Sequence, residues 1–177
     1  PQPKWIGDLN GDNKIDILDV VTMVNHVFRN GPEPTCTVTN SNTTTSSTAT
    51  VSLGSASGTT IKTIPVNLVN AEAVAGTTFK ISYDTTKIGT LKSIRTSTRT
   101  GNMQLIRNGN SFTLISSNGE TSISKGSGVI AYLDFTPPKT GFSSTSLKIT
   151  EVKAANPQAK KINVNTGSST QTTPTLS

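Results

Sequence analysis

Apolar residues near the N-terminus recur every three or four positions, which is the spacing of one face of an α-helix. Over residues 17–28 the positions on this spacing are Ile17, Val20, Val21, Val24, Val27 and Phe28. Asn30 and Gly31 follow, a pair typical of a helix end. The pattern predicts one amphipathic helix, and such a helix needs another surface to cover its apolar stripe.

From residue 50 onward, apolar and polar residues alternate instead, with the period of a half-buried β-strand. Phe79, Ile81 and Tyr83, for example, are separated by Lys80 and Ser82. Asn-Gly and Gly-Asn within the segment RNGNS predict a tight hairpin. The segments predicted as strands are 50–54, 63–69, 77–84, 89–95, 103–107, 111–117, 128–137, 145–154 and 160–164. With no helical pattern between them, they predict a mainly β protein built as an antiparallel sandwich.

The chain therefore divides into four predicted parts: an acidic loop with its helix at 1–31, a linker at 32–49, the sandwich at 50–165 and a polar tail at 166–177. The linker is rich in Ser, Thr and Pro and has no core of its own. Within it, Asn42 begins an Asn-Thr-Thr sequon and is a candidate for N-glycosylation. Cys36 is the sole cysteine, so no internal disulfide forms.

Composition limits the possible functions of this chain of 177 residues. Hydrophobic residues make up 32%, enough for one sandwich core, and no apolar run approaches the length that spans a membrane. Residues 1–34 hold three Lys/Arg against five acids, a net −2, and the remainder holds thirteen against five, a net +8. The basic residues are scattered and have no aromatic neighbours for stacking bases, so nucleic acid is not an expected partner.

The acids near the N-terminus follow the spacing of an EF-hand calcium loop. The six ligand positions fall on Asp8, Asn10, Asp12, the backbone carbonyl of Lys14, Asp16 and Asp19. Ca²⁺ prefers six to eight oxygen ligands, and a tight loop turns alternate side chains inward. Asn13 stands where glycine usually supplies a positive φ. An acidic turn that only caps the helix is the alternative, but a cap needs one acid and four unneutralised carboxylates would repel one another. The pattern therefore predicts bound Ca²⁺, in preference to Mg²⁺.

The segment GDLNGDNKIDILDVVTMVNHVF, residues 7–28, resembles one calcium repeat of a dockerin. Dockerins normally carry two such repeats, and no second loop of this kind is present in the sequence. The resemblance implies Ca²⁺ ligation by the loop. It also implies partner contacts by the apolar residues of the helix region, for which the candidates are Ile17, Leu18, Val21, Val24 and Phe28. The helix is expected to pack on its own β-domain, on a second chain, or on a repeat upstream of Pro1.

The β region, roughly residues 49–165, resembles the cohesin module, the partner of dockerins. The segments ATVSLGSASG, IPVNLVN, AGTTFKISYDTTKI and GVIAYLDFTP carry the resemblance. It implies a nine-stranded jelly-roll sandwich and recognition of proteins. The chain begins at Pro1 without a Met or a signal peptide, as a processed mature protein or a cut fragment does.

Together these features predict a non-catalytic, secreted, calcium-binding assembly protein found outside the cell or at its surface. Its expected partners are copies of itself, joined head-to-tail into fibres, or another protein bearing a dockerin or cohesin. The alternative is a carbohydrate-binding or adhesion module, for which Trp5 and Phe142 are the candidate stacking residues. An enzyme is not expected, because there is one histidine, His26, and no nucleophile–base set in the sequence.

Overall fold

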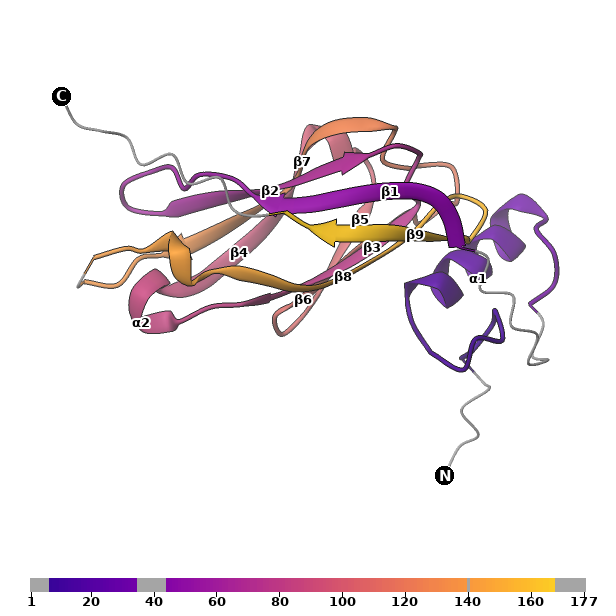
Figure 1. The fold of residues 1–177 in the computed structure, drawn as a ribbon, viewed down its shortest axis with the longest axis horizontal. Coiled ribbons are helices and arrows are strands. Elements are labelled where there is room, and N and C mark those ends of the chain that lie inside the picture. Colours follow the sequence, from indigo (N-terminus) through magenta and orange to yellow (C-terminus); the bar gives the residue numbers. More distant parts are fainter. Residues whose placement is uncertain (1–6, 35–43, 140, 168–177) are drawn as a thin grey trace.

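The computed structural model describes residues 7–34, 44–139 and 141–167. The chain forms one α-helix near the N-terminus, then nine strands with a short helix among them (Figure 1). The helices are α1 (Ile17–Arg29) and α2 (Thr85–Ile88). The strands are β1 (Thr44–Leu53), β2 (Lys62–Asn70), β3 (Gly76–Ser82), β4 (Thr90–Thr96), β5 (Gln104–Asn108), β6 (Ser111–Ile115), β7 (Gly126–Thr136), β8 (Lys148–Ala155) and β9 (Lys161–Thr166). Two 3₁₀ turns, η2 (Thr98–Thr100) and η3 (Ser144–Ser146), lie in connections.

The prediction of a mainly β protein with nine strands is confirmed, and each predicted segment overlaps one strand. Strand β1 begins at Thr44, so residues 44–49 belong to the sheet and not to the predicted linker. Strand β9 reaches Thr166, the first residue of the predicted polar tail. The first residues of β1 could not be recognised in the sequence, because they are polar and, up to Thr48, lie outside the core.

The strands form a single sheet in the order β4-β7-β2-β1-β9-β8-β3-β6-β5. The prediction that all pairs are antiparallel is wrong at one place, because β1 and β9 run parallel. These two strands lie far apart in the sequence, so no hairpin constrains their relative direction. The predicted hairpin is confirmed: β5 and β6 pair with Asn108 opposite Ser111, and Gly109 has a φ of 58°.

One core cluster holds inward-facing residues from both halves of the sheet, so the sheet is folded over on itself. Phe79 of β3 and Phe112 of β6 lie at its centre, fully buried, with their ring centroids 5.3 Å apart. Lys80 and Ser82, which alternate with the buried Phe79 and Ile81 along β3, are exposed to solvent. The predicted alternation of this strand is therefore confirmed, and it leaves an outer face free to meet other elements.

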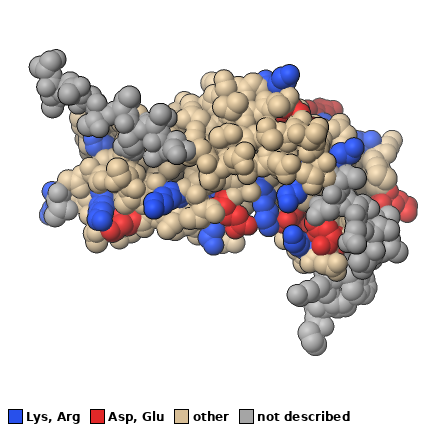
Figure 2. All heavy atoms as spheres, viewed as in Figure 1, with Lys and Arg blue, Asp and Glu red and all other residues tan. Residues whose placement is uncertain are grey.

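A second, separate cluster lies at one end of the molecule, where α1 packs on the outside of the sheet (Figure 1). Helix α2 lies at the opposite end (Figure 1). Figure 2 shows Lys and Arg spread along the visible face among acids and neutral residues, as the scattered sequence positions predict.

Candidate functional site: a loop and helix docked on the sheet

The acidic loop before α1 is closed by its own side chains. Asp8 accepts hydrogen bonds from the backbone N–H of Asp12 at 3.0 Å and of Asn13 at 2.7 Å. Asn10 accepts a bond from the same Asp12 N–H at 3.0 Å, and Asp12 accepts one from the N–H of Lys14 at 2.9 Å. Asn13 has a φ of 65°, in the left-handed region that Asn tolerates better than most residues. The positive φ expected at Asn13 is confirmed.

Asp16 and Asp19 join this loop to the start of α1. Asp16 is the N-cap and accepts from the N–H of Leu18 at 2.9 Å, and Asp19 accepts from the N–H of Asp16 at 2.7 Å. The other oxygen of Asp19 accepts from the N–H groups of Leu9, at 2.7 Å, and Asn10, at 3.3 Å. Burial raises the pKa of Asp19 although these donors oppose it, and the neighbouring Asp16 carboxylate adds to the rise. Loop and helix therefore form one unit, residues 8–29, which we call the loop–helix unit.

The ligand chemistry of the loop suits calcium, because every candidate ligand presents an oxygen. In the part of the chain that the structure describes, no group of three or more acidic, His or Cys side chains is placed to hold a metal ion. The loop carboxylates instead accept hydrogen bonds from the loop's own amides.

Helix α1 docks on the outer face of the sheet through Ile17, Leu18 and Val21, each at most 4% exposed. They lie in a bed formed at the ends of β3, β6 and β8, which we call the docking bed: Ala75, Gly76, Ile115 and Ala155. Gly76 sets the depth of the contact, because a Cβ atom there would lie 2.9 Å from side-chain carbons of both Ile17 and Val21. The small side chains of the bed let the helix approach the backbone of the sheet.

Two polar contacts flank this apolar contact. Asp16 forms an ion pair with Lys153 of β8 at 3.3 Å, and Asn25 donates a hydrogen bond to the carbonyl of Pro157 at 2.7 Å. Burial works against the charge of Lys153, but the carboxylates of Asp16 and Glu151 together outweigh it and raise the pKa of Lys153. Asp16 therefore caps the helix and fixes the orientation of the loop–helix unit on the sheet.

The predicted contact residues of the helix divide into two groups. Ile17, Leu18 and Val21 are buried in the docking bed, Val24 is half-buried, and Phe28 is 57% exposed. Seven large apolar side chains are exposed in the described chain, and five of them belong to the loop–helix unit: Ile15, Val20, Met23, Val27 and Phe28. The unit therefore has a buried apolar face and an open one. The docking bed was not predicted, and its one signal in the sequence is the small-residue pair Ala75-Gly76 at the start of a strand.

Comparison with known proteins identifies the β-domain. The family profile of the cohesin domain matches residues 44–173, more than half of the chain. The chain belongs to the cohesin family. A comparison with curated proteins gives no match.

Solved cohesin structures share the fold of this cohesin. One is in the CaDoc0917–CaCohA2 complex, with 21% identity and a TM-score of 0.55 over 67% of this chain and 94% of that one. CaCohA2 comes from Clostridium acetobutylicum. Another is a type I cohesin of Pseudobacteroides cellulosolvens, with 16% identity and a TM-score of 0.53 over 73% and 96% of the two chains. A third is in the Coh-OlpA–Doc918 cohesin–dockerin complex of Clostridium thermocellum, with 14% identity and a TM-score of 0.52 over 67% and 94%.

Cohesin domains are non-catalytic modules that bind other proteins. The prediction that this chain is not an enzyme is thereby confirmed. Among the described residues, no helix has the length and apolar character needed to cross a membrane.

The outer face of this cohesin continues beyond the docking bed as a second row of residues. This row runs across four paired strands: Ile106 of β5, Thr113 of β6, Thr78 of β3 and Lys153 of β8. Thr78 and Thr113 share a hydrogen bond of 2.9 Å between their hydroxyl groups, and Ile106 is 51% exposed. The row therefore offers one exposed apolar side chain, two hydroxyl groups and, next to α1, the ammonium group that pairs with Asp16.

Two clefts border the loop–helix unit where it meets this face. One, of about 220 Å³, lies between Ile15 of the loop and the outer residues of β3, β6 and β8, including Thr78 and Lys80. The other, of about 260 Å³, lies between Asp12 and Lys14 on the loop side and Lys161 on the sheet side, with further residues of β8. Both clefts mix charges of opposite sign, so the docked unit meets the sheet through a partly open, polar border.

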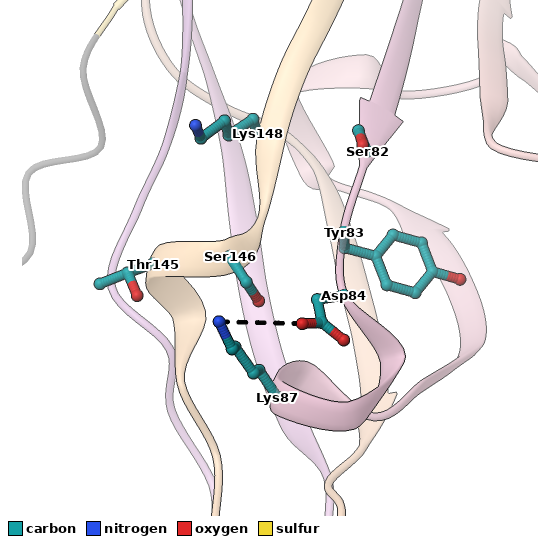
Figure 3. Close-up of a pocket in the computed structure, with 7 residues that line it drawn as sticks. All are labelled: Ser82, Tyr83, Asp84, Lys87, Thr145, Ser146 and Lys148. Carbon is teal, nitrogen blue, oxygen red and sulfur yellow. Dashed lines mark ion pairs between the residues drawn. The ribbon is translucent and has the colours of Figure 1, made fainter.

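A further recess of about 430 Å³ lies at the α2 end, lined by Ser82, Tyr83, Asp84, Lys87, Thr145, Ser146 and Lys148 (Figure 3). Its carboxylate, Asp84, caps α2 by accepting from both the hydroxyl and the N–H of Thr86, which lowers its pKa. Asp84 also pairs with Lys87 at 3.8 Å. The carboxylate is thus engaged in local structure, as the cap of α2 and the partner of Lys87.

The described residues do not support the candidates for sugar stacking and for modification. Phe142 packs partly buried against the core, and the ammonium of Lys62 lies 5.7 Å from its ring centroid. Its ring is therefore not presented as a free platform. Trp5, Cys36 and Asn42 lie outside the described residues.

Proposed function

We propose that this chain is a secreted, non-catalytic recognition module whose outer sheet face, β8-β3-β6-β5, binds the loop–helix region of a dockerin-bearing protein. One observation supports this choice of face: the chain's own helix docks there, on residues that leave room for it. Complexes of solved neighbours pair cohesins with dockerins. A neighbour that belongs to scaffoldin B of Acetivibrio cellulolyticus supports the extracellular setting.

The free part of this face suits a protein surface better than a small ligand. The second row carries Ile106, half exposed, beside the hydroxyl groups of Thr113 and Thr78. Lys80 and Ser111 continue it on the side away from α1. An apolar anchor surrounded by short polar groups is the composition of a protein-interaction surface.

Binding to purified dockerin modules tests this proposal. We expect Ile106→Asp to weaken binding at least about ten-fold, because it places an uncompensated charge at the centre of the contact. Val69→Asp is the matched control, since Val69 is similarly exposed, at 54%, but lies on β2 in the other half of the sheet. Equal losses in the two variants, or no binding by the wild type to any calcium-loaded dockerin of a broad panel, would count against this face.

We also propose that the loop binds Ca²⁺ through the side chains of Asp8, Asn10, Asp12, Asp16 and Asp19 and the carbonyl of Lys14. The oxygen-only donor set supports this, as does the positive φ of Asn13 at the position where such loops turn sharply. The ion would neutralise the repulsion among four carboxylates and so tighten the loop against α1. Isothermal titration with Ca²⁺ tests the site, and a chain that releases no heat and shows no shift in its loop amides would exclude it.

Assembly of the chain with copies of itself is a second proposed function. It is favoured by the presence of both a loop–helix unit and a face that accepts one in a single chain. Contacts of this head-to-tail kind produce open fibres or closed rings. Light scattering at rising protein concentration, with Ca²⁺ and with EDTA, measures it. We expect assemblies in Ca²⁺ that dissociate in EDTA, and assemblies of unchanged size in EDTA would contradict the calcium-dependent mechanism.

A further inference from the structure

The docking of α1 is a self-contained contact. Its cluster of buried residues shares no member with the main core, which closes without it. The main contacts of the unit with the sheet are three buried apolar side chains, the ion pair of Asp16 and the hydrogen bond from Asn25. Because the sandwich has its own core, the unit can leave the docking bed while the sandwich stays folded.

The connection between helix and sheet permits exchange between molecules. Fourteen residues, 30–43, lie between the end of α1 and the start of β1. Extended, a segment of this length reaches up to about 50 Å. A tether of this length holds the helix at an effective concentration of the order of millimolar near its own bed. The unit of another molecule therefore competes with the tethered one for the same bed.

We propose that the docking bed is an exchangeable site whose partner is the loop–helix unit of a second copy, and that the chain's own α1 blocks this site in the monomer. The proposal rests on the function proposed above, recognition of a loop–helix unit by the outer sheet face. The unit docked within its own chain gives a closed monomer. The same contacts made between chains give a swapped dimer or a head-to-tail chain.

Gly76 makes the proposal testable, because a side chain at this position fills the docking bed without changing the sequence of α1. Its backbone is not in the left-handed region, so a side chain there meets no backbone strain. Its Cβ would, however, collide with Ile17 and Val21. Gly76→Val therefore closes the bed and leaves a functional helix free. Val21→Asp does the reverse, because a carboxylate in place of a side chain that is 2% exposed undocks the helix and leaves the bed open.

The decisive experiment mixes these two full-length variants and measures mass by light scattering. Neither variant docks its own helix, and only the helix of Gly76→Val on the bed of Val21→Asp makes the native contact. We expect each variant alone to be monomeric and the mixture to form a one-to-one heterodimer. Its formation should need a concentration at least about ten-fold below that at which the wild type associates, since the tethered competitor is absent.

The matched control replaces Val21→Asp by Val20→Asp in the mixture. Val20 is the neighbouring valine but is 46% exposed, so this chain keeps its own helix docked and should capture no partner. If Gly76→Val fails to fold, Ala155→Leu closes the same bed from β8. A mixture that stays monomeric while both variants retain the sandwich spectrum overturns the exchange. If the mixture stays monomeric but Val21→Asp binds a dockerin of the panel, the proposed dockerin-binding function stands and only the exchange fails. If Val21→Asp, with its open bed, binds no dockerin either, the result counts against both proposals.

Discussion

The two adjacent valines of α1 offer a direct measure of how firmly the loop–helix unit is docked. Val21 is 2% exposed in the docking bed, whereas Val20, one residue earlier and about 100° around the helix, is 46% exposed. Replacing either by Ser changes the helix propensity by the same small amount, so the difference between the variants reports the docking contact alone. We expect Val21→Ser to weaken docking strongly and Val20→Ser to leave it nearly unchanged.

The size of the effect follows from the buried area. Full burial of a valine side chain contributes about 1.5–3 kcal/mol, and little of this contribution remains for Ser. Val21→Ser should therefore lower the free energy of docking by about 2–3 kcal/mol, which is roughly 30- to 150-fold in the docking equilibrium. For Val20→Ser the expected change is within about 0.5 kcal/mol, as for other exposed positions.

Native-state hydrogen exchange is the suitable assay, because undocking is a local event. The amides of α1 should exchange roughly 30- to 150-fold faster in Val21→Ser, while amides of β2 and β7, which belong to the main core, keep the wild-type rate. The free energy of unfolding of the sandwich should stay the same. Equal acceleration of α1 in both variants, or loss of sandwich protection in Val21→Ser, would refute the reasoning.

Three further results are expected. Asp134, whose pKa is held at about 2 instead of 3.8 chiefly by the Arg95 guanidinium, stabilises the fold above about pH 4 and loses this contribution as the pH falls towards 2. In urea titrations, the free energy of unfolding of the wild type should therefore exceed that of Asp134→Asn by about 2 kcal/mol at pH 6 and by almost nothing at pH 2. A difference that stays constant with pH would contradict this. Asp12→Ala should weaken Ca²⁺ binding at least about ten-fold in isothermal titration, since it removes one charged ligand, and unchanged affinity would exclude Asp12 as a ligand. Lys153→Met should weaken α1 docking by less than about 1 kcal/mol in the exchange assay, because the Lys153 side chain is 40% exposed and its ion pair with Asp16 is partly screened. A loss as large as that of Val21→Ser would contradict the apolar origin of docking.

Much of the fold could be predicted because it depends on local patterns. The alternation around Phe79 and Ile81 indicated which face of β3 enters the core, and Asn108 and Gly109 marked the hairpin that joins β5 to β6. The first six residues of β1 could not be predicted. They are Ser, Thr and Ala, and neighbouring strands hold them in the sheet without any apolar pattern of their own.

The candidate site was predictable in its loop but not in its surroundings. Asp8, Asn10 and Asp12 stand at a spacing set by the loop itself, and the backbone at Asn13 adopts the expected positive φ. The spacing of apolar residues placed Val20 and Val21 in the same predicted stripe of the helix. This stripe is wider than the surface that docks on the sheet, so it includes both buried and exposed positions. Only the docked structure separates them.

The sequence by itself determined the elements: a loop with its helix, nine strands and the residues that alternate along them. These follow from short-range periods of 3.6 and 2 residues and from the turn-forming residues between them. The tertiary structure decided the parallel pairing of β1 with β9, the folding of one sheet around one core, and the place where α1 docks. That place depends on Gly76, Ile115 and Ala155, which come from three strands and form a bed only after the sheet has assembled. Contacts between residues so far apart in sequence leave no local period, so only the folded chain reveals them.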